Sequence, residues 1–410
     1  MNMLHSLRIS TLAVMAMFAA VADVRAQTAS VDDTAKFLAG MMPSANSPLV
    51  PLTQEAAWQR HAKFFDGAFG QLEQRQISRI RTWADANLSA PKPVMFYMFS
   101  GPDFLYANAF HSRASTYVLS ALEPIGSVPD LTRLPRGGIA SALYNVERSL
   151  ESILSFSFFI TKDMKTDLQS GQISGTLPIL YVFLARSGMT VKSVEPVALD
   201  DKGTAYPAGE NPGAKAVRGV RIVFAGSDGP DKTLYYFSTD LSNAGVKTSG
   251  FLKFCETLGP ANSLIKSASY LLHEGNFSTV RSFLLNNSAS IVQDDSGIPI
   301  GYFNAKKWRF FPFGRYLGPI DKFPGLHQPS YAELFRRAQP VDFGIGYRWR
   351  THETNVLLAV KLPDDGTAGI ETVSAESSSP PPPPRRPQRP RPPADIFAPQ
   401  PRDGGFFFWR

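Results

Sequence analysis

Apolar residues in the first half of the chain recur at intervals of three and four positions, a spacing that places them on one face of a helix. The clearest stripe opens after Gly137 and Gly138 and consists of Ile139, Leu143, Val146, Leu150, Ile153 and Leu154. Similar spacing predicts helices over 53–69, 72–88, 176–188, 263–272 and 277–285. A break is expected between the first two of these helices, near Gly67 and Gly70.

Strands are expected where short runs are wholly apolar, aromatic or alternately polar and apolar. Such runs cover 94–99, 116–119, 191–199, 217–224, 233–237, 290–292, 298–303, 341–349 and 355–361. The segments 227–230 (Ser-Asp-Gly-Pro) and 294–297 (Asp-Asp-Ser-Gly) have the composition of tight turns, so each predicts a hairpin. We therefore predict an α+β fold, with a helix-rich first half packed on a largely antiparallel sheet, in preference to a doubly wound sheet.

The N-terminus has the pattern of a secretory signal peptide. Arg8 precedes an almost wholly apolar run over 9–22, and Val24-Arg25-Ala26 places small residues where an export peptidase cleaves. The apolar run is about 14 residues long, shorter than the roughly 18 to 20 needed to span a bilayer. We expect residues 1–26 to be removed near Ala26, which leaves a soluble periplasmic or secreted protein.

The region from 27 to 363 is long enough for one large globular domain, or for two lobes with a break near residue 190. Its longest apolar runs, 153–160 and 177–185, are too short for a transmembrane helix. Cys255 is the only cysteine, so no internal disulfide can form and the hydrophobic core has to provide the stability.

The C-terminal segment 364–410 has the composition of a disordered tail. It contains serines at 377–379, prolines at 380–384 and then arginine and proline in alternation up to Pro393. Such a sequence favours an extended, partly polyproline-II chain. It is interpreted as a solvated spacer, with the alternative that its arginines contact an anionic surface.

The net charge of +7 is spread along the chain. The signal peptide carries +1 and residues 375–410 carry +3, which leaves +3 for the globular region. Nucleic-acid binding requires clustered lysine and arginine, so no nucleic-acid partner is expected.

The segment from Ser100 to His111 has the most distinctive local chemistry. The chain is expected to leave the strand over 94–99, turn through Ser-Gly-Pro-Asp and begin a short helix near Asp103. Four polar groups are then expected near one strand end: the hydroxyl of Ser100, the carboxylate of Asp103, the amide of Asn108 and the imidazole of His111. The alternative interpretation is that Ser100 or Asp103 simply caps the helix and that His111 simply ends it.

This part of the chain resembles a family of exported bacterial proteins without an assigned activity. The resemblance covers mainly 96–130, through the Ser-Gly-Pro-Asp-Phe turn and Leu-Glu-Pro-Ile-Gly at 122–126, and it extends to the Asp-Asp-Ser-Gly segment at 294–297. It implies no catalytic residue. It implies only that the segment 96–130 is the part of the protein on which its function depends.

Two further groups of residues are candidates for ligand binding. Asp294 and Asp295 could act as paired carboxylates, but an Asp-Asp-Ser-Gly segment is also common in turns. Between 302 and 316, aromatic residues are interleaved with cations, and Trp308, Arg309 and Arg315 could hold an anionic glycan or another envelope polymer. The same aromatics could equally fill the core while the cations point outward.

Other patterns of enzyme chemistry are weak. Ser263 and Lys266 match a Ser-x-x-Lys spacing that is common by chance, and Cys255 lies among apolar residues. The histidines show no metal-ligand spacing, and the sequence has no phosphate-binding loop or dinucleotide fingerprint. Neither a metal nor a cofactor is predicted.

Two classes of function therefore remain open. The favoured class is a non-catalytic exported protein that binds a ligand or associates with the envelope. The alternative is a periplasmic hydrolase with a centre around Ser100, Asp103 and His111, joined by one of the carboxylates at 294–295.

Overall fold

The computed structural model describes residues 28–363, apart from 136, 160–172, 208–209, 211–212, 214–215 and 228. All of the described residues belong to one compact unit, which extends to Asp364. The predicted signal peptide over 1–26 and the predicted tail over 364–410 lie outside the described residues.

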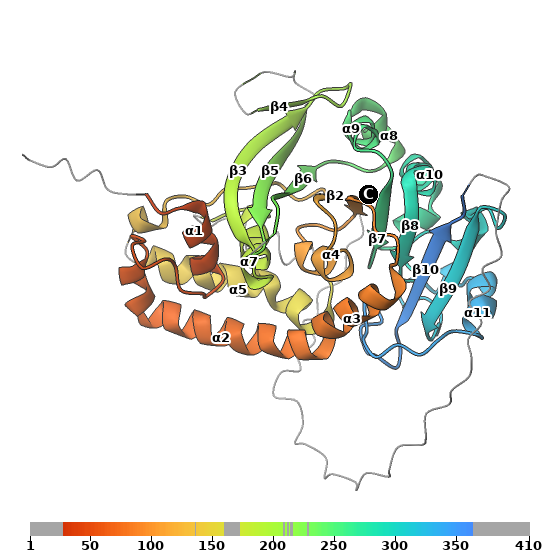
Figure 1. The fold of residues 1–410 in the computed structure, drawn as a ribbon, viewed down its shortest axis with the longest axis horizontal. Helices are drawn as coiled ribbons and strands as arrows, with labels where there is room; N and C mark the ends of the chain where they lie inside the picture. Colours follow the sequence, from red (N-terminus) through yellow and green to blue (C-terminus); the bar gives the residue numbers. More distant parts are fainter. Residues whose placement is uncertain are drawn as a thin grey trace, which may run out of the picture. The chain divides into compact units, whose positions relative to one another are not determined.

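A ten-stranded mixed sheet runs through this unit (Figure 1). Its strands, in sheet order, are β4 (Ala205–Pro207), β3 (Thr190–Leu199), β5 (Val217–Ala225), β6 (Lys232–Ser238), β2 (Thr116–Ala121), β1 (Val94–Met98), β7 (Ala261–Ile265), β8 (Ser288–Gln293), β10 (Asn355–Lys361) and β9 (Trp308–Gly314). The five strands from β6 to β8 are parallel, and every pairing outside them is antiparallel. The α+β class is therefore confirmed, with a parallel centre between antiparallel flanks.

The strand order of the parallel centre changes direction at β1. The next parallel strands, β2 and β6, lie on one side of β1, whereas β7 and β8 lie on the other. The carboxyl ends of β1 and β7 are neighbours at this switch point, which is the usual position of ligand sites in open parallel sheets.

Helices cover both faces of the central strands. Alternate residues of β1 belong to different apolar clusters: Met95 and Tyr97 lie in one, Phe96 and Met98 in the other. Helices α1 (Val31–Leu38), α2 (Ala56–Leu72), α3 (Ser78–Asn87), α4 (Phe104–Phe110), α5 (Gly138–Phe156) and α7 (Leu177–Arg186) contribute to the first cluster. Helices α8 (Asn243–Thr248), α9 (Phe251–Thr257) and α10 (Ser278–Asn287) contribute to the second. A fully buried parallel centre is the expected result.

The remaining elements are short. Helix α11 (Pro329–Phe335) lies beside β9 at the outer end of the sheet (Figure 1). A π-helical turn over Glu73–Ile77 joins α2 to α3. Short 3₁₀ helices cover Val50–Gln54, Leu131–Arg133, Leu271–His273, Gly275–Phe277, Ile300–Tyr302 and Pro324–Leu326.

Several elements differ from the sequence prediction. Helix α2 passes through Gly67 and Gly70 without a break, because both positions face open space and no packing contact forces a turn there. The predicted helix over 263–272 begins as the buried strand β7, since its short apolar run fits either structure. The segment 294–297 does not close a hairpin, because β8 pairs with β7 and β10. The expected strand over 341–349 has only an isolated bridge between Ile345 and Arg348.

Candidate functional site

A buried ion pair joins the carboxyl ends of β1 and β7. The Lys266 Nζ lies 2.9 Å from Asp103 Oδ2, and both side chains are at most 2% exposed. Asp103 Oδ2 also accepts a hydrogen bond of 2.9 Å from the Tyr97 hydroxyl. The carboxylate therefore connects the end of β1 with the turn that follows β7.

The local sequence explains the position of Asp103. The chain leaves β1 through Phe99 and Gly101, both of which have positive φ, and Pro102 precedes the helix. Asp103 is the N-cap of α4, and its Oδ1 accepts the Tyr106 backbone N–H at 3.1 Å. The predicted strand, turn and cap are thus confirmed, and the same carboxylate additionally neutralises Lys266.

Lys266 is surrounded by protein on all sides. Its Nζ lies 3.7 Å from the centre of the Tyr106 ring and donates a hydrogen bond to the Ser157 carbonyl. Burial lowers the pKa of Lys266, while the charge of Asp103 acts in the opposite direction. The Ser-x-x-Lys spacing does not reflect a nucleophile pair, because Ser263 bonds instead to the Ser288 hydroxyl at 2.7 Å.

Asp294 and Asp295 lie directly after β8 at the same edge of the sheet. Asp294 accepts the backbone N–H groups of Ser267 and Ser296, both at 3.0 Å. Burial, followed by the neighbouring charge of Asp295, raises the pKa of Asp294 to about 7. The pair was predicted as candidate carboxylates, and the structure places both of them in the interior, where ionisation is costly.

Asp295 is held by a separate set of partners. Its carboxylate accepts the Tyr270 hydroxyl at 2.7 Å and the Asn355 side-chain amide at 3.0 Å. Burial also raises the pKa of Asp295. These bonds connect the turn after β7 with the first residue of β10.

Strained backbone is concentrated around this edge. In the described ranges, the non-glycine residues with positive φ are Phe99, Ser157, Ser267, Ser269 and Tyr270. Phe99 follows β1, and Ser157 accepts a hydrogen bond from Lys266. Ser267, Ser269 and Tyr270 follow β7. Such conformations persist only where the surroundings enforce them. Ser267 donates its backbone N–H to Asp294 and Tyr270 donates its hydroxyl to Asp295, and these hydrogen bonds constrain the two residues.

The proposed hydrolase residues are not brought together. Ser100 donates its hydroxyl proton to the Gly101 carbonyl at 2.8 Å. His111 lies at the opposite end of α4 from Asp103, and its Nε2 has no hydrogen-bond partner in the described structure. Burial lowers the pKa of His111 to about 4. Asn108 accepts a long hydrogen bond of 3.3 Å from the Tyr117 hydroxyl.

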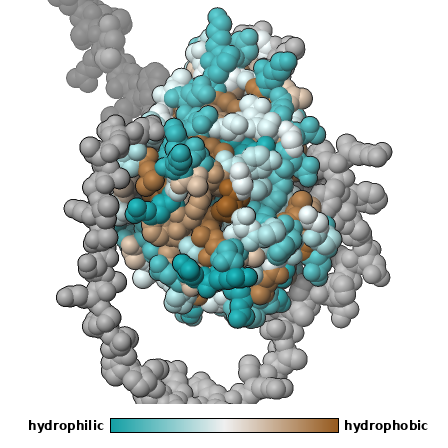
Figure 2. All heavy atoms as spheres, turned by 90° about the vertical axis from the view of Figure 1, so that its right-hand side faces the viewer, coloured by the Kyte–Doolittle hydropathy of each residue, from teal (hydrophilic) through white to brown (hydrophobic). Residues whose placement is uncertain are grey.

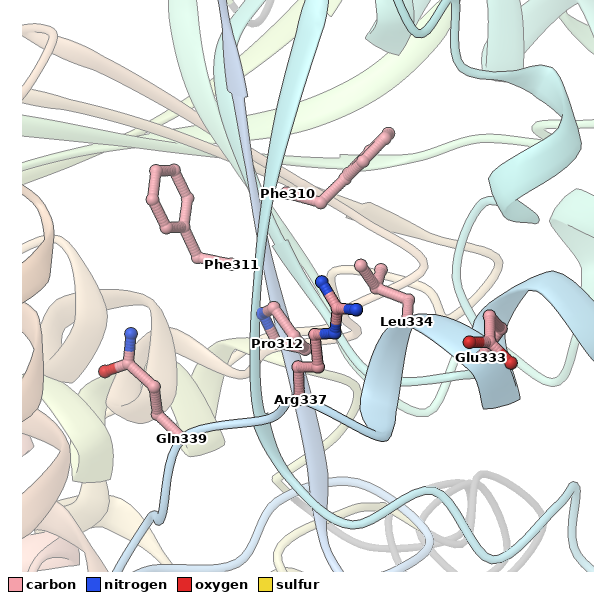
Figure 3. Close-up of a pocket in the computed structure, with 7 residues that line it drawn as sticks. All are labelled: Phe310, Phe311, Pro312, Glu333, Leu334, Arg337 and Gln339. Atoms are coloured by element: carbon pink, nitrogen blue, oxygen red, sulfur yellow. The ribbon is translucent and has the colours of Figure 1, made fainter. Parts of the chain in front are cut away.

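A second site is open to solvent. A groove of about 530 Å³ lies along β9 at the outer end of the sheet. It is lined by Phe310, Phe311 and Pro312 of β9, Glu333 and Leu334 of α11, and the following residues Arg337 and Gln339. Phe310 and Phe311 project to opposite sides of the strand, and Leu334 lies on the same side as Phe310 (Figure 3). The side of the molecule seen in Figure 2 has apolar surface gathered between hydrophilic side chains.

The groove lies in the segment where aromatic residues and cations alternate, but its lining differs from the predicted residues. Trp308 is buried against Phe303 and belongs to the core. Arg309 and Arg315 are exposed, at and just beyond the ends of the strand. The contributions of Leu334 and Arg337 were not predicted, because neither α11 nor its position beside β9 was recognised.

No family model, curated protein or solved structure matches this chain. Within the described ranges, no three histidine, cysteine, aspartate or glutamate side chains are grouped as a metal site would require. In the same part of the chain, no helix is long and apolar enough to cross a bilayer.

Proposed function

We propose that this chain is an exported, non-catalytic binding protein whose ligand is anionic and occupies the groove along β9. The observation that carries the proposal is the combination of an open groove with exposed arginines. Among the described residues, neither Arg309 nor Arg337 has a carboxylate within ion-pair distance, whereas Glu333 is paired with Arg336 at 2.8 Å. The groove therefore offers positive charge beside apolar walls.

The buried cluster at the switch point has a different role in this proposal. Asp103, Lys266, Asp294 and Asp295 bond to one another or to neighbouring backbone and hydroxyl groups, and each is at most 3% exposed. A catalytic group has to reach its substrate. We assign these residues to holding the ends of β1, β7 and β8 in place.

Export is supported by the sequence of residues 1–26. A periplasmic or secreted location gives the protein access to acidic envelope polymers and to acidic segments of envelope proteins. The arginine-rich C-terminal sequence would be a second contact to an anionic surface, independent of the groove.

Titration calorimetry on the mature chain tests the proposal with two anionic probes, an oligouronate and an acidic peptide. We expect saturable binding of at least one probe, weakened by salt and by Arg337→Gln. Arg60→Gln is the matched control, because it removes another exposed arginine, on α2. Binding that is equal in both variants, or no binding of either probe, would refute the proposal.

A further inference from the structure

We infer that the groove binds an extended acidic polypeptide segment of a partner protein, which adds to the sheet as a strand beside β9. This inference rests on the proposed function and specifies its ligand. It depends on three properties of β9: its free backbone edge, the walls of the groove and the local charge.

The hydrogen bonds at the end of β9 fix which of its backbone groups point outward. Gly314 donates its N–H to the Gln339 carbonyl at 2.8 Å, and Gln339 donates to the Pro312 carbonyl at 2.9 Å. Successive residues of an antiparallel strand alternate in direction. The N–H and C=O groups of Phe310 and Trp308 therefore also point away from β10.

These outward groups are available for pairing. β9 pairs only with β10 along its length, apart from the contact of its end with Gln339. In the described structure, no backbone or side-chain group bonds to the main chain of Phe310 or Trp308 on the outer edge. Pro312 occupies an outward position, where its missing N–H costs no bond to β10. The free edge thus extends from Trp308 to Phe310 and ends at Pro312.

The walls of the groove suit an extended chain. Phe310 and Leu334 form one wall, and Phe311 forms the other (Figure 3). Side chains of an added strand point alternately to the two sides. Main-chain bonds to Phe310 and apolar contacts on both sides are the usual components of strand addition.

The positive charge near the outer edge of β9 favours an acidic partner. Lys306 lies just before β9, Arg309 lies within it and Arg337 lines the groove, and all three side chains are exposed. A second copy of this chain would bring the same cations against one another, so self-pairing is disfavoured. An anionic glycan could meet the arginines, but it lacks the regular N–H and C=O groups that match the free edge. An acidic peptide satisfies both requirements.

The test uses the full mature chain and four synthetic probes. These are an alternating Glu-Val peptide, its Lys-Val counterpart, a depsipeptide in which ester oxygens replace the amide N–H groups of the Glu-Val sequence, and an oligouronate. Affinities are measured by titration calorimetry for wild type, Arg309→Gln, Arg337→Gln and the control Arg60→Gln. Circular dichroism confirms that each variant is folded.

We expect the Glu-Val peptide to bind and the Lys-Val peptide not to bind. The depsipeptide should bind about tenfold more weakly, because it cannot donate to the edge of β9. Arg309→Gln and Arg337→Gln should each weaken peptide binding by up to about fivefold, the range of a surface ion pair. Arg60→Gln should leave it unchanged.

Other results separate the two proposals. If the oligouronate binds in an Arg337-dependent manner and the peptide does not, strand addition is wrong but an anionic-ligand function stands. If neither probe binds, both proposals fail. Equal affinity for the peptide and the depsipeptide would overturn strand addition, as would sedimentation showing that the chain dimerises through the β9 edge.

Discussion

Asp103 and Lys266 form a 2.9 Å ion pair that joins the turn after β1 to the turn after β7, with both side chains buried. The two residues lie far apart in the sequence and meet only because β1 and β7 are adjacent in the sheet. This pair should therefore be sensitive to any change that leaves one of the charges alone.

Lys266→Met should destabilise the protein by about 3 to 5 kcal/mol, the usual cost of leaving one buried charge without its partner. The double variant Asp103→Asn with Lys266→Met should recover part of this loss, because the remaining charge is removed as well. Chemical denaturation of wild type and the three variants measures the coupling. If the losses of unfolding free energy in the two single variants simply add up in the double variant, Asp103 and Lys266 do not interact directly.

Asp103→Asn should be almost as destabilising as Asp103→Ala. A residue that only caps α4 would tolerate Asn, since Asn also accepts the Tyr106 N–H. Here the substitution also removes the counter-charge of Lys266. Thermal unfolding of both variants distinguishes a helix cap from a counter-charge. If Asp103→Asn is as stable as wild type, Asp103 acts only as the cap of α4.

The pKa of Asp294 gives the stability a definite dependence on pH. Its folded value of about 7 lies above the unfolded value of 3.8, so the folded state binds more protons between these values. The contribution of Asp294 to stability is thus greatest at low pH and is lost as pH rises from about 4 to 7. The histidines His111 and His273, whose pKa burial lowers to about 4, act in the opposite direction within this window.

Comparison with Asp294→Asn measures the pH dependence that the Asp294 carboxylate contributes, including its effect on the neighbouring Asp295. Asn resembles the protonated acid, so the variant should gain stability relative to wild type as pH rises through the window. Urea denaturation at several pH values between 4 and 8 provides the measurement. A constant difference between the two proteins would show that Asp294 is already ionised at the lower pH.

Two glycine substitutions should have opposite effects. Gly346 has a φ of +66°, and an added Cβ would lie 1.8 Å from Asp294 Oδ2, so Gly346→Ala should be strongly destabilising. Gly67→Ala should stabilise the protein by about 0.5 to 1 kcal/mol, because this position is helical and the new methyl group meets no atom. Melting temperatures of the two variants provide the comparison. A neutral Gly346→Ala would contradict the close packing around Asp294.

The proposed export can be tested directly by mass spectrometry. Protein recovered from the envelope fraction should start at or near Gln27, since the cleavage pattern ends at Ala26. Recovery of a chain with an intact Met1 from the cytoplasm would refute the proposed location.

Local features of this chain could be predicted from its sequence. The strand before Phe99, the turn through Gly101 and Pro102, and the helix capped by Asp103 all depend on neighbouring residues. The antiparallel arrangement of β5 and β6 likewise follows from the turn composition between them.

Features that depend on distant residues were predicted less well. Leu264 and Ile265 fit a helix as well as a strand, and only pairing with β1 and β8 makes this segment a strand. For the same reason, the partner of Lys266 could not be identified from the spacing of Ser263 and Lys266. The groove was partly anticipated from the aromatics and cations around Phe310, but its second wall comes from α11.

The strand order also has a consequence for the timing of folding. β1 lies between β2 and β7, and β2 in turn pairs with β6, so the parallel centre draws on segments from residue 94 to residue 293. Such nonlocal pairing forms slowly, because the long connections have to close before these strands can pair. Until Gln293 has been synthesised, the last of these parallel strands is missing. The central sheet of this topology is therefore completed later during synthesis than a sheet built from local hairpins alone.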